Sequence, residues 1–226
     1  MDWDPLFLSL EAALIATLIA GVVGVALGAL LARPRMPGRH LLDALIAAPM
    51  VMPPTVLGYY VLVTVGRKSA IGGLYRDLVG SDLTFTFHGV VLAASIGALP
   101  MIAKAARTAF EGVDPTLPRA ARTLGAGRLR AFFTVTLPLA APGVIGGLML
   151  GFARGLGDFG VTLMVAGDIP GETQSAPLAI YDHVQAKREH AAATSSLVLT
   201  IGAVVILYAV NRLTRDRHRE DEARWH

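Results

Sequence analysis

Two charged residues, Arg154 and Asp158, lie well inside a long apolar stretch of the sequence. Either one would cost roughly 2.5–3.5 kcal/mol if it stood alone near the centre of a membrane helix, so neither is expected to face lipid. Their i, i+4 spacing places them on one helical face, where they can form an ion pair. The pair is either a neutralised structural contact, or Arg154 faces a polar pathway and meets an anion while Asp158 is paired or turned away.

The other reactive residue types form no catalytic constellation. The sequence has no cysteine, which excludes disulfides, thiolate catalysis and cysteine-ligated metals. Its six histidines fall at the edges of apolar segments, in loops or in the tail, so no metal site is indicated. Gly66-Arg-Lys-Ser69 is similar to the end of a phosphate-binding loop, but Arg67 and Leu62 occupy the two positions that require glycine. The sequence therefore predicts a protein that is not an enzyme and does not hydrolyse ATP itself.

The composition is that of an integral membrane protein. Hydrophobic residues make up 54% of the 226 residues, charged residues 16%, and the mean hydropathy is +0.56. These values are too apolar for an ordinary soluble domain. The net charge of +3 could suggest nucleic acid, but the arginines gather in short loops beside apolar segments. That distribution fits membrane topology better than phosphate binding, so no nucleic-acid partner is expected.

Five apolar segments are long enough to cross a bilayer. The first starts with acidic residues and is followed by Arg33 and Arg39, which predicts an outer N-terminus, and by parity the C-terminus is cytoplasmic. Arg67 and Lys68, in the predicted outer loop 66–86, oppose this positive-inside pattern. We predict one all-α, multi-pass membrane domain over residues 1–226, with lipid around it. Its spans are expected at about residues 6–32, 41–65, 87–110, 141–166 and 191–213.

Prolines interrupt the second apolar segment. Pro49, Pro53 and Pro54 remove three backbone donors near mid-membrane depth and must break or kink the helix just before Thr55. Irregular backbone at that depth is tolerated inside protein or along a watery path. The interruption is therefore either a structural kink or part of a translocation pathway that it lines or gates.

Glycines recur at every fourth position of the fourth segment, at Gly143, Gly147, Gly151 and Gly155. In membranes such a stripe of small residues lets another helix approach closely. We therefore expect the stripe to make either a helix–helix contact or a contact between the subunits of a dimer.

A polar island, residues 111–138, separates the third and fourth segments and is predicted to be cytoplasmic. It contains a short amphipathic pattern that starts at Pro118, breaks at Gly125 and Gly127, and closes at Pro138. A helix of this kind cannot bury its apolar stripe alone. It either lies on its own membrane domain or docks into a groove on a partner protein.

The island resembles the "EAA" loop of importer-type ABC permeases, in which a short coupling helix sits in a cleft of the ATP-hydrolysing subunit. Arg119 stands where that family has its leading glutamate, so a salt bridge made by that glutamate is not available here. The resemblance implies a surface that couples to an ATPase. Its residues are Arg119, Ala120, Ala121, Leu124, Gly125, Arg128 and Pro138.

The resemblance extends over nearly the whole chain and narrows to the permease subunits of molybdate importers, with tungstate and sulfate permeases as close relatives. Phe-Ala-Arg-Gly-Leu-Gly-Asp-Phe-Gly160 carries part of it, with Asp158 in place of the usual glutamate. It implies a homodimer in the bacterial cytoplasmic membrane, two ATPase subunits that hold ATP and Mg²⁺, and an extracytoplasmic oxyanion-binding protein. No cofactor is expected in this chain, and transport would proceed by alternating access.

The alternative functions are another oxyanion importer, a channel or secondary transporter, and a membrane-embedded enzyme. Import of sulfate or another oxyanion would use the same architecture. A stand-alone channel or secondary transporter would suit the broken second segment, but it leaves the glycine-broken cytoplasmic helix unexplained. A membrane-embedded enzyme would need paired histidines or carboxylates inside the spans, and the sequence has none there.

Overall fold

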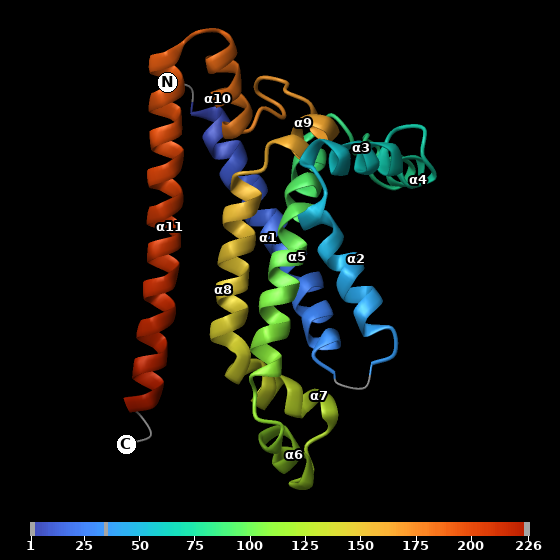
Figure 1. The fold of residues 1–226 in the computed structure, drawn as a ribbon, viewed down its shortest axis with the longest axis vertical. Coiled ribbons are helices and arrows are strands. Elements are labelled where there is room, and N and C mark those ends of the chain that lie inside the picture. The colour runs from blue at the N-terminus through green and yellow to red at the C-terminus, as the bar shows by residue number, and fades with distance from the viewer. Residues whose placement is uncertain (1–2, 34–35, 224–226) are drawn as a thin grey trace.

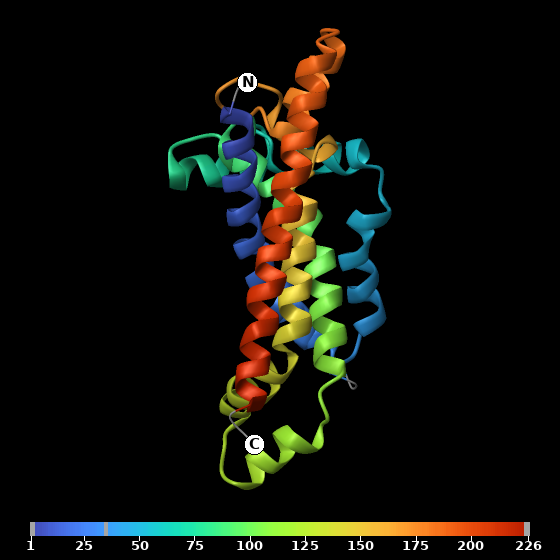
Figure 2. The same ribbon diagram turned by 90° about the vertical axis from the view of Figure 1, so that its left-hand side faces the viewer.

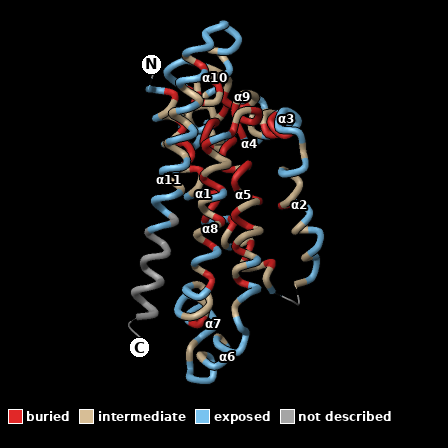
Figure 3. Tube along the Cα trace, turned by 60° about the vertical axis from the view of Figure 1, so that its left-hand side comes forward, coloured by how far each residue is buried: buried red, intermediate tan, exposed pale blue. Residues whose placement is uncertain are grey.

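Long helices lying side by side make up most of the computed structural model, which describes residues 3–33 and 36–223 (Figure 1). α5 (Phe87–Glu111) is the central helix, and α1 (Asp4–Leu31) and α8 (Leu137–Leu156) pack along it. The most apolar stretch of α5 is 67% buried, against 33% for α1. Figure 3 shows buried positions concentrated along α5 and the helix faces turned toward it. The predicted all-α class is confirmed.

Within the described residues, four helices are long and apolar enough to cross a bilayer, and a bent helix pair makes a fifth span if it is counted as one. The fourth of these helices, α11 (Glu189–Ala223), stands at the edge of the bundle beside α8 (Figure 2). Its most apolar stretch is not buried by the rest of the chain. Such a surface requires an apolar surrounding, as a lipid bilayer provides.

The second apolar segment consists of two helices with an angle of 114° between them, α2 (Arg39–Val51) and α3 (Pro54–Val65). The chain turns at Met52, which is extended as expected for a residue before proline. Pro53 and Pro54 lack the N–H groups that would continue the helix. The break expected from the prolines is present, and it makes α3 leave the direction of α2 (Figure 1).

The fourth apolar segment is also interrupted, which the sequence analysis did not expect. α8 ends at Leu156, and the chain resumes helical structure as α9 (Gly160–Ala166). The helix predicted over residues 141–166 is therefore not continuous. Gly157 ends α8, and the Asp158 carboxylate bonds the first turn of α9, which gives the backbone an alternative to one uninterrupted helix.

The connecting elements gather at the two ends of the bundle. α6 (Thr116–Thr123), α7 (Arg128–Ala131) and the π-helical turn Phe132–Thr136 form one end, called here the α6 end (Figure 2). The opposite end, called the α4 end, holds the start of α1, together with α3, α9 and two more short helices (Figure 1). These are α4 (Ala70–Val79) and α10 (Ala176–Gln185).

Candidate functional site

Arg154 and Asp158 form an ion pair at the break between α8 and α9. Arg154 Nη1 donates to Asp158 Oδ1 at 2.9 Å. The other carboxylate oxygen, Oδ2, accepts from the backbone N–H of Thr162 at 3.0 Å and from its hydroxyl at 2.8 Å. The Asp158 side chain is 1% exposed and that of Arg154 is 30% exposed. Both carboxylate oxygens are therefore occupied, and the pair holds the end of α8 to the first turn of α9.

The Arg154 guanidinium lies beside Gly97 of α5. A Cβ atom at Gly97 would be 3.5 Å from Arg154 Cζ. The guanidinium thus lies against the central helix while part of it stays exposed. Because Asp158 is buried and paired, it does not offer a free negative charge that would repel an anion near Arg154.

The two helix breaks meet in space. A Cβ atom at Gly160, the first residue of α9, would lie 2.6 Å from the Cβ of Pro54, the first residue of α3. Further along, a Cβ at Gly58 would lie 2.7 Å from the Cβ of Met164. Glycine is therefore required for α3 and α9 to pack this closely. Residues far apart in the sequence form one junction of two interrupted helices.

The predicted gate residues do not all join this junction. Pro53, Pro54 and Thr55 lie at the start of α3, and Arg154 with Asp158 lies at the adjoining break between α8 and α9. Pro49 is instead inside α2, before the bend. The contact between the two breaks could not be predicted from the sequence alone.

The glycine stripe of α8 faces α5 of the same chain. Cβ atoms at Gly143, Gly147 and Gly151 would come within 2.6, 2.7 and 2.5 Å of Ala109, Ala105 and Ile102 side chains. Gly155 lies farther out, with 3.6 Å to the Ala94 Cβ. The stripe thus makes a close contact between helices within the chain.

The predicted coupling segment exposes its apolar side chains at the α6 end. None of the eight residues of α6, all of which are described, is buried. Leu124 directly after it is 89% exposed and Leu129 is 76% exposed. Arg119, Ala120 and Ala121 lie on α6 itself, Arg128 starts α7, and Pro138 lies in the first turn of α8. The chain leaves this surface uncovered, as a docking surface would be.

Gly125 shapes the turn between α6 and α7. Its φ of +91° is in the left-handed region, which glycine adopts without steric cost. The N–H of Ala126 donates to the Ala121 carbonyl at 3.1 Å, which closes the end of α6. At the other end of α6, the Thr116 N–H donates to Asp114 Oδ1 at 2.8 Å and lowers the pKa of that carboxyl.

A network of ion pairs near the α6 end was not found by sequence reasoning. Asp43 of α2 accepts from Lys104 at 3.3 Å and pairs with Arg107 at 3.0 Å, and both cations lie on α5. Arg107 also pairs with Glu111 at 3.0 Å, and Glu111 pairs with Arg39 of α2. The network ties the helix that precedes the proline break to the end of α5 that leads into α6.

Comparison with known proteins covers almost the entire chain. A profile of the family described as "Binding-protein-dependent transport system inner membrane component" matches residues 24–218. The molybdenum transport system permease protein ModB of Escherichia coli K12 is 41% identical over 220 residues, which cover 96% of both chains. ModB of Haemophilus influenzae is 42% identical over 185 residues, covering 82% of this chain and 81% of its own. The sulfate transport system permease protein CysT of Salmonella typhimurium is 32% identical over 208 residues, covering 91% and 74%.

A solved structure has the same fold. A chain of the inward-facing MetNI methionine ABC transporter matches with a TM-score of 0.72 and 18% identity, covering 94% of each chain. At this identity the match concerns the helix arrangement alone.

Proposed function

The chain belongs to the family of binding-protein-dependent transport system inner membrane components, and we propose that it is the permease subunit of an ATP-driven importer of molybdate. The assignment of molybdate as the substrate rests on the similarity of this chain to molybdenum permeases along almost their whole length. It is a multi-pass protein of the inner membrane and acts as a transport subunit, not as an enzyme.

The α6 segment is the proposed contact with the ATPase. A short helix with no buried residue, flanked by the exposed Leu124 and Leu129, fits a groove on another protein. Arginines on and beside this segment suit an acidic rim around such a groove. Two ATPase subunits, each with ATP and Mg²⁺, would bind the α6 segments of two copies of this chain.

The proposed mechanism is a change in helix packing rather than a chemical reaction. ATP binding brings the two coupling segments together, and the long helices transmit the movement to the junction of α3 and α9. The interrupted helices move there with the least loss of backbone hydrogen bonds, because those bonds are already broken. The oxyanion enters the pathway when the helices open it outward, and ATP hydrolysis restores the inward-facing state.

The α4 end is the proposed outer face, where an oxyanion-binding protein delivers its cargo. This sidedness follows from the arginines of the α6 segment, which belong on the cytoplasmic side under the positive-inside rule. Binding of molybdate in the pathway would rely on weak contacts, with Arg154 as the cation near the junction. Because Arg154 is already neutralised by Asp158, the pathway can release the anion.

Cellular molybdenum tests the function. A strain that lacks this chain is grown at low molybdate, and its molybdenum content is measured by elemental mass spectrometry with and without the chain restored. We expect a loss that wild type rescues and Leu124→Asp does not, because a carboxylate on the docking surface opposes binding to the ATPase. Normal molybdenum in the deletion strain, together with reduced sulfate uptake, would transfer the assignment to sulfate.

A second measurement separates the importer from a stand-alone channel. The tagged chain is purified from the native membrane, and the bound proteins are quantified. A stoichiometric ATPase supports the importer, whereas molybdate transport by the chain alone in liposomes would contradict it.

A further inference from the structure

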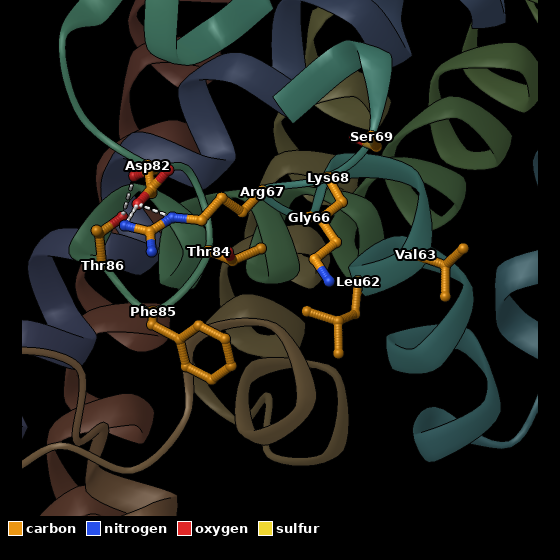
Figure 4. Close-up of a pocket in the computed structure, with 10 residues that line it drawn as sticks. All are labelled: Leu62, Val63, Gly66, Arg67, Lys68, Ser69, Asp82, Thr84, Phe85 and Thr86. Carbon is orange, nitrogen blue, oxygen red and sulfur yellow. Dashed lines mark hydrogen bonds and ion pairs between the residues drawn. The ribbon is translucent and has the colours of Figure 1, made fainter. Parts of the chain in front are cut away.

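A cavity of about 840 Å³ lies at the α4 end, between the C-terminal part of α3 and the loop before α5 (Figure 4). It does not contain the α3–α9 junction described above. Its walls combine apolar side chains with basic and hydroxyl groups. Among the lining residues are Leu62, Arg67, Lys68, Asp82, Thr84 and Phe85.

Asp82, the carboxylate among these lining residues, is held by arginine through Oδ2, whereas its buried Oδ1 accepts no hydrogen bond from a described residue. Arg67 Nε donates to Asp82 Oδ2 at 2.8 Å, and Arg76 Nη1 approaches Asp82 Oδ1 at 3.7 Å. The hydrogen bond from Arg67 lowers the pKa of Asp82, so this carboxyl stays ionised. Two guanidinium groups thus share one carboxylate, which leaves an excess of positive charge at this wall.

Lys68, an exposed residue, adds a cation with no ion-pair partner in the described part of the chain. Figure 4 shows Arg67 turned toward Asp82, whereas Lys68 extends toward Leu62, away from that carboxylate. Thr84 is 5% exposed, lines the same cavity, and its hydroxyl forms no hydrogen bond with any described residue. An unpaired ammonium and an unpaired hydroxyl in one cavity are the groups that bind a tetrahedral oxyanion.

Topology gives a second reason to look for an anion here. Arg67 and Lys68 lie at the end of the bundle opposite the arginine-rich α6 segment, against the positive-inside pattern. Basic residues that topology does not require need another explanation. Attraction of an anion to the outer mouth of a transporter is one that their charge provides.

The cavity is also connected to the junction of α3 and α9. Phe85 donates its N–H to the Val165 carbonyl at 3.0 Å, and its ring would meet a Cβ at Gly167 at 3.1 Å. The cavity wall is therefore fixed to the C-terminal end of α9, and α3 runs from the cavity to Pro54. An anion bound in the cavity would therefore lie near the C-terminal ends of α3 and α9, whose N-terminal ends form the junction.

We propose that this cavity is a binding site for a tetrahedral oxyanion, held by the Lys68 ammonium and the Thr84 hydroxyl, outside the junction of α3 and α9. The statement that this anion is the one transported rests on the proposed function. Arg67 is a positioning residue, since it binds Asp82 and keeps that carboxylate away from the anion.

Protection of Lys68 from acetylation tests the site directly. The complete transporter is placed in nanodiscs of neutral phosphatidylcholine and treated with acetic anhydride, and acetylation of Lys68 and Lys187 is followed by mass spectrometry. Lys187 is the matched control, because it is an exposed lysine at the same end that does not line the cavity. Molybdate at about ten times its dissociation constant should slow acetylation of Lys68 roughly tenfold and leave Lys187 unchanged.

Three other outcomes of the acetylation experiment would overturn the site or change the assignment of its ligand. Equal acetylation of both lysines under all conditions overturns the site. Protection by phosphatidylglycerol nanodiscs without added anion assigns the cavity to a lipid phosphate and overturns the role for a transported anion. Protection by sulfate but not molybdate supports the site and contradicts the molybdate assignment, so the two proposals fail separately.

Uptake kinetics give an independent readout. Lys68→Gln should raise the KM for molybdate uptake about tenfold with little change in kcat, since one charge-assisted hydrogen bond is lost. Lys187→Gln removes the same charge from the same end and should leave both constants unchanged. If the two variants behave alike, general surface charge explains the effect and the specific site is wrong.

Discussion

Gly160 and Pro54 lie so close that a Cβ atom on Gly160 would be 2.6 Å from the Cβ of Pro54. The interruption between α2 and α3 therefore rests directly on the interruption between α8 and α9. Residues of α5, among them Ala93 and Ile96, pack against both α3 and α9 beside this contact. Because the helical hydrogen bonds are already interrupted on both sides of this contact, we expect it to be the part of the fold best suited to open and close.

Gly160→Val should impair transport through this contact. The branched side chain would force Pro54 away and separate α3 from α9, so molybdate uptake should fall at least about tenfold while the protein still reaches the membrane. Uptake of labelled molybdate and the amount of chain in the membrane are measured together. Gly146→Ala is the control, since no described atom lies within 4 Å of a Cβ placed there. Full uptake by Gly160→Val would contradict a role for the contact.

Asp158→Asn should destabilise the protein because it leaves the Arg154 charge without its partner. We expect a loss of about 2–3 kcal/mol, seen as a lower Tm of the purified protein in detergent. Thr162→Val removes only the hydroxyl bond to Asp158 and should cost about 1 kcal/mol. The double variant Arg154→Gln with Asp158→Asn should lose less than the two single losses combined. Additive losses would mean that the ion pair contributes nothing specific.

Gly125→Val should uncouple the permease from its ATPase. A β-branched residue at a φ of +91° costs about 1–3 kcal/mol and shifts the turn that positions Leu124. Less ATPase should then co-purify with the chain. Gly127→Ala is the matched control, because its φ is −64° and no described atom crowds its Cβ position. Equal loss of ATPase in both variants would argue against a specific shape for this turn.

Asp43→Asn should loosen α2 from α5. It removes the partner of Lys104 and one of the two partners of Arg107, which keeps Glu111, and since these groups are partly exposed the loss should be about 1 kcal/mol. The fall in Tm should be larger at low ionic strength than at high ionic strength, because salt screens the pairs in the wild type. Asp77→Asn changes an exposed carboxylate that forms no ion pair among the described residues and should have no such effect. A salt-independent fall would point to packing instead.

Asp168 should make stability depend on pH. Burial, followed by the nearby Asp182 charge, raises the pKa of Asp168, and its Oδ1 atom is buried with no hydrogen-bond partner among the described residues. The folded state therefore holds this proton more tightly than the unfolded state. Stability should fall as pH rises from the ordinary carboxyl pKa, about 4, through the raised folded value, and stay level outside that window.

The variant Asp168→Asn tests this pH effect. It should flatten the slope of Tm against pH in that window and raise Tm at neutral pH, because an uncompensated charge is removed. Gln174 donates to Asp182 Oδ2 at 3.0 Å, so Asp182 remains bonded in the variant. An unchanged slope would assign the pH dependence to another group.

Local chemistry was readable from the sequence. Proline lacks an N–H wherever it stands, so Pro53 and Pro54 had to interrupt the second segment. Glycines at every fourth position had to form a narrow helix face, and the i, i+4 spacing allowed Arg154 and Asp158 to pair. The all-α class followed from apolar segments of membrane length. These properties depend on residues that are neighbours in the chain.

The tertiary structure alone decided what those features touch. The break after Leu156 carries no proline, and its local signal is the weaker one of Gly157, Asp158 and Gly160, in a stretch that the sequence analysis assigned to helix packing and an ion pair instead. Arg39 and Glu111 form an ion pair although they are 72 residues apart in the sequence. Pro54 and Gly160 are also in contact, although several helices separate them along the chain. The glycine stripe indicated close approach, and within the chain its contacts are with α5. A periodicity shows which face of a helix is narrow or apolar, whereas the packing of all helices together determines which surface fills it.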